Sequence, residues 1–183
     1  MIHKTYSSEG FILGRRNFSE ADRILVLFTR DFGKISLMAK GVRKLTSRKR
    51  GGIEIFNHIK FFAVKGKSLD ILTEVRTIDS YDEIRKDLRR VSIGYYFCEV
   101  IGKVTRDGET HQDIFGILEK YFEALKTSRN LKETRLSFIK EVLIDLGFWS
   151  STQKMDNPDL VLEGIVERKI NSSRVGKKML QQD

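Results

Sequence analysis

The chain has 183 residues, of which 40% are hydrophobic and 32% charged. This composition is typical of a folded globular protein and argues against disorder throughout. The formal net charge is +9, and it is uneven: 16 Lys and Arg face 8 Asp and Glu up to Ser80, against 18 and 17 beyond it. No apolar run is long enough to span a bilayer, and with Cys98 as the only cysteine no intrachain disulfide can form. The N-terminus lacks a signal-peptide pattern, so we expect a reducing, cytoplasmic location.

The first part of the chain reads as β-structure. Residues 10–13 are apolar, residues 24–28 form a continuous apolar run, and residues 35–39 and 59–64 alternate in the period of a half-buried strand. A turn at residues 65–68 leads into a further strand ending near Val75. About five short strands with one long basic connection are typical of a small barrel such as the OB-fold.

The pattern changes near Ser80, where Ser80 and Glu83 have the spacing of a capping box. Apolar faces at helical spacing then recur in residues 93–104, 114–125, 136–146 and 161–166, and they predict four helices. Gly147 is expected to end the third helix, and Asn157 and Pro158 to begin the fourth. Phe148 and Trp149 are either a partner-binding surface or a cap on the helical core. The basic tail from Ser172 is predicted to form a short helix or to fray.

The densest feature is a basic cluster between the third and fourth predicted strands, free of acidic residues and closed by Gly51 and Gly52. Like charges this close repel one another, and an anionic partner such as a phosphate backbone relieves that repulsion. A solvated loop is the plainer interpretation, since charge runs usually have that role. On a small barrel, however, cations from several strands can line one groove for nucleic acid. The candidate DNA-binding residues are Arg15, Arg16, Arg23, Lys34, Lys40, Arg43, Lys44, Arg48, Lys49 and Arg50.

Aromatic residues of the same region are candidates for stacking on bases: Phe18, Phe32, Phe56, Phe61 and Phe62. Aromatics in strands are more often core residues than stacking platforms. Phe18 and Phe32 lie beside turn residues, so we expect these two to be the least likely to be fully buried.

Metal and catalytic chemistry find no support in the sequence. The three histidines are scattered, no Cys-x-x-Cys or His-x-x-x-His spacing occurs, and Cys98 is expected to be a small buried hydrophobe. Glu20 and Asp22 are the one close acidic pair near the basic cluster, and we expect them to serve the turn before Ile24. No cofactor and no enzymatic activity are therefore expected.

Several short motifs occur together at fixed spacing in residues 20–25, 27–30, 33–34, 40–41, 47–48 and 50–51. They are preceded by Glu9 and Gly10. They are followed by Tyr95-Tyr96, residues 146–148 and Glu167-Arg168. Together they resemble the bacterial recombination mediator family RecO. The resemblance is most specific from Glu20 to Gly51 and extends over almost the whole chain.

The resemblance implies an α+β protein with an OB-fold DNA-binding domain in residues 1–80 and a helical domain in residues 81–183. It further implies a nucleoid-associated, non-catalytic protein that binds single- and double-stranded DNA and anneals complementary strands. The family acts with RecR to load RecA onto DNA coated by single-strand-binding protein, and it contacts the acidic C-terminal tail of that protein. Many members carry a four-cysteine zinc site after the Leu-Gly-aromatic segment. Residues 148–153 contain no cysteine, so we expect this zinc site to be missing.

Two functional hypotheses follow from the sequence. The first is a DNA-binding recombination mediator whose basic cluster neutralises phosphates, with a steep dependence on salt. The second is a protein-interaction adaptor whose basic barrel docks an acidic partner. A nuclease would need clustered acids and a metal, which the sequence does not offer.

Overall fold

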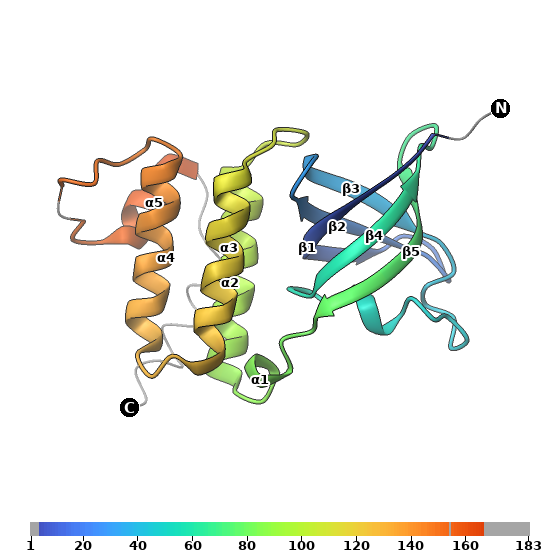
Figure 1. Ribbon diagram of the computed structural model, residues 1–183, viewed down its shortest axis with the longest axis horizontal. Coiled ribbons are helices and arrows are strands. Elements are labelled where there is room, and N and C mark those ends of the chain that lie inside the picture. The colour runs from blue at the N-terminus through green and yellow to red at the C-terminus, as the bar shows by residue number, and fades with distance from the viewer. Residues whose placement is uncertain (1–3, 154, 167–183) are drawn as a thin grey trace. The chain divides into compact units, whose positions relative to one another are not determined.

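The computed structural model describes residues 4–153 and 155–166 (Figure 1). The chain folds into two compact units. The first contains residues up to Ser80 together with Thr105–His111, and the second contains Tyr81–Val104 and the chain from Gln112 onward.

The first unit is a closed barrel of five strands in the order β1-β2-β3-β5-β4 (Figure 1). β3 and β5 run parallel, and every other neighbouring pair is antiparallel. This is the OB-fold that the sequence predicts. The strands are β1 (Thr5–Asn17), β2 (Arg23–Thr29), β3 (Gly33–Ala39), β4 (His58–Val64) and β5 (Asp70–Asp79).

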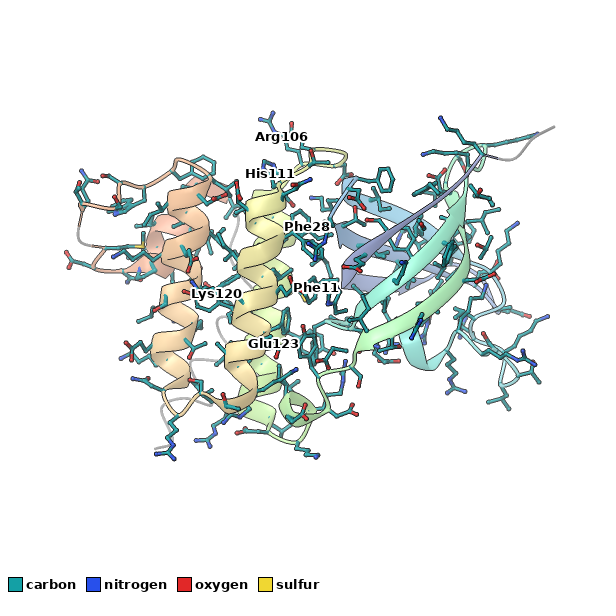
Figure 2. All side chains as sticks on the ribbon, viewed as in Figure 1. Phe11, Phe28, Arg106, His111, Lys120 and Glu123 are labelled. Carbon is teal, nitrogen blue, oxygen red and sulfur yellow. The ribbon has the colours of Figure 1, made fainter. Side chains whose placement is uncertain are left out.

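Alternation along the strands fills the barrel. Leu25 and Leu27 of β2, Leu37 of β3 and Phe61 of β4 all point into one buried cluster, because side chains two apart share a face. β1 is longer than the sequence suggests, since a bulge near Ile12 bends it so that its first half pairs with β4 and its second half with β2. Outside this cluster, Phe11 and Phe28 are register partners on β1 and β2 and are also buried (Figure 2).

The segment Thr105–His111 belongs to the barrel unit because it packs on the start of β3. The Gly108 amide donates to the Lys34 carbonyl at 2.9 Å. Gly33 has a φ of +63°, and a Cβ there would clash with the backbone carbonyl of Glu109. A side chain at position 33 therefore meets both a left-handed backbone and the packed segment.

The second unit consists of helices α1 (Asp82–Arg85), α2 (Leu88–Val104), α3 (Gln112–Thr127), α4 (Leu131–Asp145) and α5 (Pro158–Val166). Phe97 of α2 lies at its centre, with ring centroids 5.6 Å from Phe122 of α3 and 4.1 Å from Phe138 of α4. The α+β architecture, an OB-fold followed by helices, is thus confirmed.

The predicted capping box at Ser80 and Glu83 is wrong. Tyr81 precedes α1 in a left-handed conformation without a side-chain cap, and the long helix begins later, where Asp87 Oδ1 accepts a bond of 2.9 Å from the Arg89 amide. Asn157 caps α5 ahead of Pro158 as predicted. Gly147 follows α4 with a φ of +74°, also as predicted. Glu167, Arg168 and the basic tail from Ser172 lie outside the described residues.

Candidate nucleic-acid interface

The basic loop, defined here as residues 40–57, connects β3 to β4 and is folded onto the barrel. Val42 and Ile53 are fully buried in the barrel core and anchor its two ends. Gly52 packs on β5, where an added Cβ would lie 3.2 Å from Val75 Cγ1. Its main observed role is therefore close packing within the barrel. The cations between these anchors are left on the surface.

The β1–β2 turn, residues 18–22, is tied to the start of the basic loop. The Gly41 amide donates to Asp22 Oδ1 at 2.7 Å, and the Arg43 amide donates to the Ala21 carbonyl at 2.9 Å. Arg43 Nη1 also donates to the Ser19 carbonyl at 2.5 Å. Asp22 thus serves the turn, as the sequence predicts, and it also joins two loops at one end of the barrel.

Three further guanidinium groups lie near that of Arg23 at this end. Burial lowers the pKa of Arg23, and the positive charges of Arg15, Arg43 and Arg50 lower it further, against the opposing effect of Glu54. Arg15 forms an ion pair with Glu54, and Arg23 Nε donates to Asn17 Oδ1 at 3.1 Å. Arg15 is paired with Glu54, and the other guanidinium groups leave a positive field around Arg23, which an anion would relieve.

A hollow of about 440 Å³ lies between the basic loop and β5. Lys49 fixes one wall, because its ammonium donates to the Leu72 carbonyl at 3.1 Å. Glu74 is the one acidic group in the lining. The lining residues are Gly41, Lys44, Thr46, Ser47, Arg48, Lys49, Thr73, Glu74 and Val75.

Most predicted site residues lie together at this end of the barrel. Five are exposed and make no side-chain hydrogen bond or ion pair within the described part of the chain: Arg16, Lys40, Lys44, Arg48 and Arg50. Arg15, Arg23, Arg43 and Lys49 belong to the same group but are partly engaged in the contacts above.

Lys34 is the exception, because it lies at the other end of β3, about 20 Å of strand away from Lys40. Its ammonium donates to the Thr105 carbonyl at 2.6 Å and lies 3.4 Å from Asp107 Oδ1. The side chain is 14% exposed. Lys34 therefore holds the segment Thr105–His111 on the barrel and is not brought to the basic loop.

The candidate stacking residues differ in how far their side chains are exposed to solvent. Phe56 and Phe61 are fully buried, whereas Phe18 is 61% exposed on the β1–β2 turn next to the basic loop. Phe62 is 42% exposed on β4, and Phe32 is 37% exposed in the β2–β3 turn, with its ring 4.9 Å from that of Tyr6. Phe18 is thus the exposed aromatic beside the arginine group. Neither Phe18 nor Phe32 is fully buried, as expected, although Phe62 is more exposed than Phe32. The predicted burial of Cys98 is confirmed.

One contribution to the site is not predicted by the sequence. Thr73–Val75 of β5 line the hollow beside Arg48, although some 25 residues separate them in the chain. The signal that could reveal this contribution of β5 is the OB-fold strand order, which places β5 beside β3.

Phe148 and Trp149 lie after α4. Phe148 is about half exposed, and the indole of partly buried Trp149 donates to the Gln153 carbonyl at 3.3 Å, so both interpretations of this pair remain open.

Across residues 4–153 and 155–166, no group of three or more His, Cys, Asp or Glu side chains is arranged to hold a metal ion. None of the helices in this range combines the length and the apolar character needed to cross a membrane.

Comparison with known families agrees with this architecture. Residues 1–81 match the family described as "Recombination protein O N terminal", and residues 85–153 match "Recombination protein O C terminal". The chain belongs to the RecO family. The resemblance inferred from residues 20–51 is confirmed.

Curated relatives of this RecO-family chain carry the name DNA repair protein RecO. The relative from Alkaliphilus metalliredigens is 33% identical over 136 residues, which cover 74% of this chain and 54% of the relative. The one from Pelotomaculum thermopropionicum is 33% identical, covering 63% and 45%, and the one from Roseiflexus is 30% identical, covering 81% and 52%. The chain spans about half the length of the curated relatives it matches.

Proposed function

We propose that this RecO-family chain is a non-catalytic DNA-binding protein of recombinational repair that binds the sugar-phosphate backbone with the basic loop. The observation that carries the proposal is the group of cations at one end of the OB barrel, where the guanidinium groups of Arg15, Arg43 and Arg50 lie near Arg23 and the exposed cations of the basic loop adjoin them. Arg48 and Arg50 are exposed and have no side-chain partner among residues 4–153 and 155–166, so they supply charge, and Phe18 offers a face for a base. Both single- and double-stranded DNA present the phosphates that such a surface binds.

Annealing follows from the same electrostatics. Two complementary strands repel each other through their phosphates. Cations that neutralise these phosphates lower the electrostatic barrier to bringing the strands together, and base pairing supplies the specificity. Family membership supports the further roles that we propose: cooperation with RecR, contact with the acidic tail of single-strand-binding protein, and loading of RecA onto DNA coated by that protein.

The first experiment is fluorescence anisotropy of a labelled single-stranded oligonucleotide across a salt series. If about five phosphates are neutralised, the log–log slope of the binding constant against salt is roughly −3.5. The variant Arg48→Ala/Arg50→Ala should weaken binding and make the slope shallower by roughly 1.4, because two contacts are lost. Lys49 is left unchanged, since it anchors the loop to β5.

The matched control is Lys4→Ala/Lys67→Ala, which removes two exposed cations that belong neither to the arginine group nor to the lining of the hollow. This control should leave the slope near the wild-type value. Equal slopes for the two double variants would exclude the basic loop as the binding surface.

The adaptor hypothesis uses the same surface, because guanidinium groups bind carboxylates as well as phosphates. Adding an aspartate-rich peptide to the protein–oligonucleotide complex compares the two ligands directly. Tight peptide binding at the basic loop, with no oligonucleotide binding at low salt, would replace the DNA-binding proposal with the adaptor.

A further inference from the structure

A second cationic pocket lies within the helical unit, at the start of α2 and the turn between α3 and α4. It encloses about 590 Å³, which is the size of a nucleotide-scale ligand site. The lining residues are Arg89, Arg90, Ser128, Arg129, Asn130, Leu131 and Lys132, and none of them is acidic. This concentration of charge stands out in a part of the chain whose Lys and Arg nearly equal its Asp and Glu.

The walls of the pocket are fixed by hydrogen bonds. Arg90 donates through Nη1 to the Leu125 carbonyl and through Nη2 to the Ser128 carbonyl at 2.9 Å, which holds the end of α3 against α2. Asn130 caps α4, since its Oδ1 accepts from the Glu133 amide at 3.1 Å. The site is therefore formed before any ligand arrives, which lowers the cost of ordering it on binding.

Two of the four cations have their charge free for a ligand. Arg129 and Lys132 are exposed and make no side-chain hydrogen bond or ion pair in the described part of the chain. Arg89 adds a partly exposed guanidinium, with Nε 3.5 Å from Asp87 Oδ1. The nearby acids have partners, because Asp87 faces Arg89 and Arg90, and Glu133 accepts from the Asn130 amide group. The starts of α2 and α4 add positive potential at the same place.

The chemistry of the lining favours a phosphate backbone over a peptide. Leu131 is the one apolar residue in it and is itself 8% exposed, so the pocket surface is mainly polar and holds little that suits apolar peptide side chains. Guanidinium and ammonium groups set around a polar hollow suit phosphodiester oxygens. We propose that this pocket binds the backbone of a second nucleic-acid strand. The inference rests on the proposed function, in which the basic loop binds the first strand.

The experiment counts bound strands. The wild-type protein is titrated at low salt with a labelled oligothymidine of about eight nucleotides, a length suited to one small site. Oligothymidine cannot pair with itself, so each bound molecule reports one site. We expect two oligonucleotides per chain for the wild type and one for Arg129→Glu/Lys132→Glu. The Arg48→Ala/Arg50→Ala variant should retain the pocket site while its basic-loop site is weakened.

The matched control is Lys140→Glu, which makes the same exchange at an exposed position of α4 outside the pocket. It should retain two sites. Thermal unfolding of each variant checks that the helices are intact, and an acidic residue at position 132, in the first turn of α4, does not weaken that helix.

The outcomes separate the two proposals. A wild-type stoichiometry of one, abolished by the basic-loop change alone, overturns the second site and leaves the proposed function standing. A stoichiometry of one abolished only by the pocket change supports this site and overturns the basic loop. Binding of an aspartate-rich peptide at the pocket, with no oligonucleotide bound there, overturns the assignment to nucleic acid.

Discussion

Arg135 and Asp159 show how a single ion pair holds the last helix of the described chain. The guanidinium and the carboxylate meet in two parallel hydrogen bonds of 2.6 and 3.0 Å, with the residues 8% and 5% exposed. Burial alone lowers the pKa of Arg135, but the bonds to Asp159 outweigh it and keep the pKa above its usual value. The Tyr96 hydroxyl donates to the same carboxylate at 3.0 Å, so α2, α4 and α5 meet at one group.

Removing the carboxylate of Asp159 should therefore lower the stability of the helical unit. We expect Asp159→Ala to lower the free energy of unfolding by roughly 3–5 kcal/mol in urea denaturation, because it leaves a buried guanidinium without its partner. The control is Lys120→Ala, at the α3 residue labelled in Figure 2. This change breaks an exposed pair between Lys120 and Glu141 of α4 and should lower the free energy of unfolding by less than about 1 kcal/mol. Similar losses for both variants would contradict this account.

At this scale the sequence predicts which residues are buried far better than it predicts which polar groups meet. Ile93, Phe97 and Leu118 follow from helical spacing alone. Arg135 and Asp159 carry no such signal, since they are 24 residues apart and each would be placed on the surface by its type.

Among the elements, the segment Thr105–His111 shows how one glycine positions a whole stretch of chain. Gly33→Ala should destabilise the protein by roughly 2 kcal/mol more than Gly41→Ala, because both add backbone strain but only the first forces the packed segment to move. Gly41 has a φ of +66°, and no atom lies within 4 Å of the place that an added methyl group would take, so this variant isolates the strain. Equal unfolding midpoints in urea would show that the segment is not held at Gly33.

The strands and helices also show which features local sequence patterns can predict and which they cannot. Period-two alternation locates the strands, and Gly147 and Asn157 locate helix ends, because these are local signals. The capping box near Ser80 misleads because Ser80 and Glu83 have the right spacing by chance, whereas the backbone turns at Tyr81 and the helix starts after Asp87. No local pattern could reveal that residues 105–111 return to β3.

For the whole molecule, two cationic surfaces on one chain have a kinetic consequence. If each chain holds one strand on the basic loop and the other in the helical pocket, annealing is fastest when strands share a chain. We expect the annealing rate of complementary oligonucleotides, followed by fluorescence quenching, to rise with protein concentration and then to fall in excess, when every strand has its own chain. A rate that rises to a plateau would argue against bridging.

The grouping of charge at this scale is only partly predictable. The basic loop is contiguous, so the sequence displays most of it, but grouping Lys34 with it is wrong because the two are separated by the length of β3. The helical pocket joins Arg89 and Arg90 to Arg129 and Lys132 across some 40 residues. Only the packing of α2 against the α3–α4 turn brings them together.

The parallel contact between β3 and β5 is the part of the barrel where we expect local unfolding to start. It has two register pairs, whereas each of the other neighbouring strands shares seven. We therefore expect local opening to begin at this contact, so that amide hydrogens there exchange with solvent before those of the rest of the barrel in a hydrogen-exchange measurement. The basic loop continues from the end of β3 and contacts β5 through Lys49 and Gly52. A polyanion bound to the basic loop would therefore hold the loop on β5 and stabilise the contact between β3 and β5, which has the fewest register pairs in the barrel.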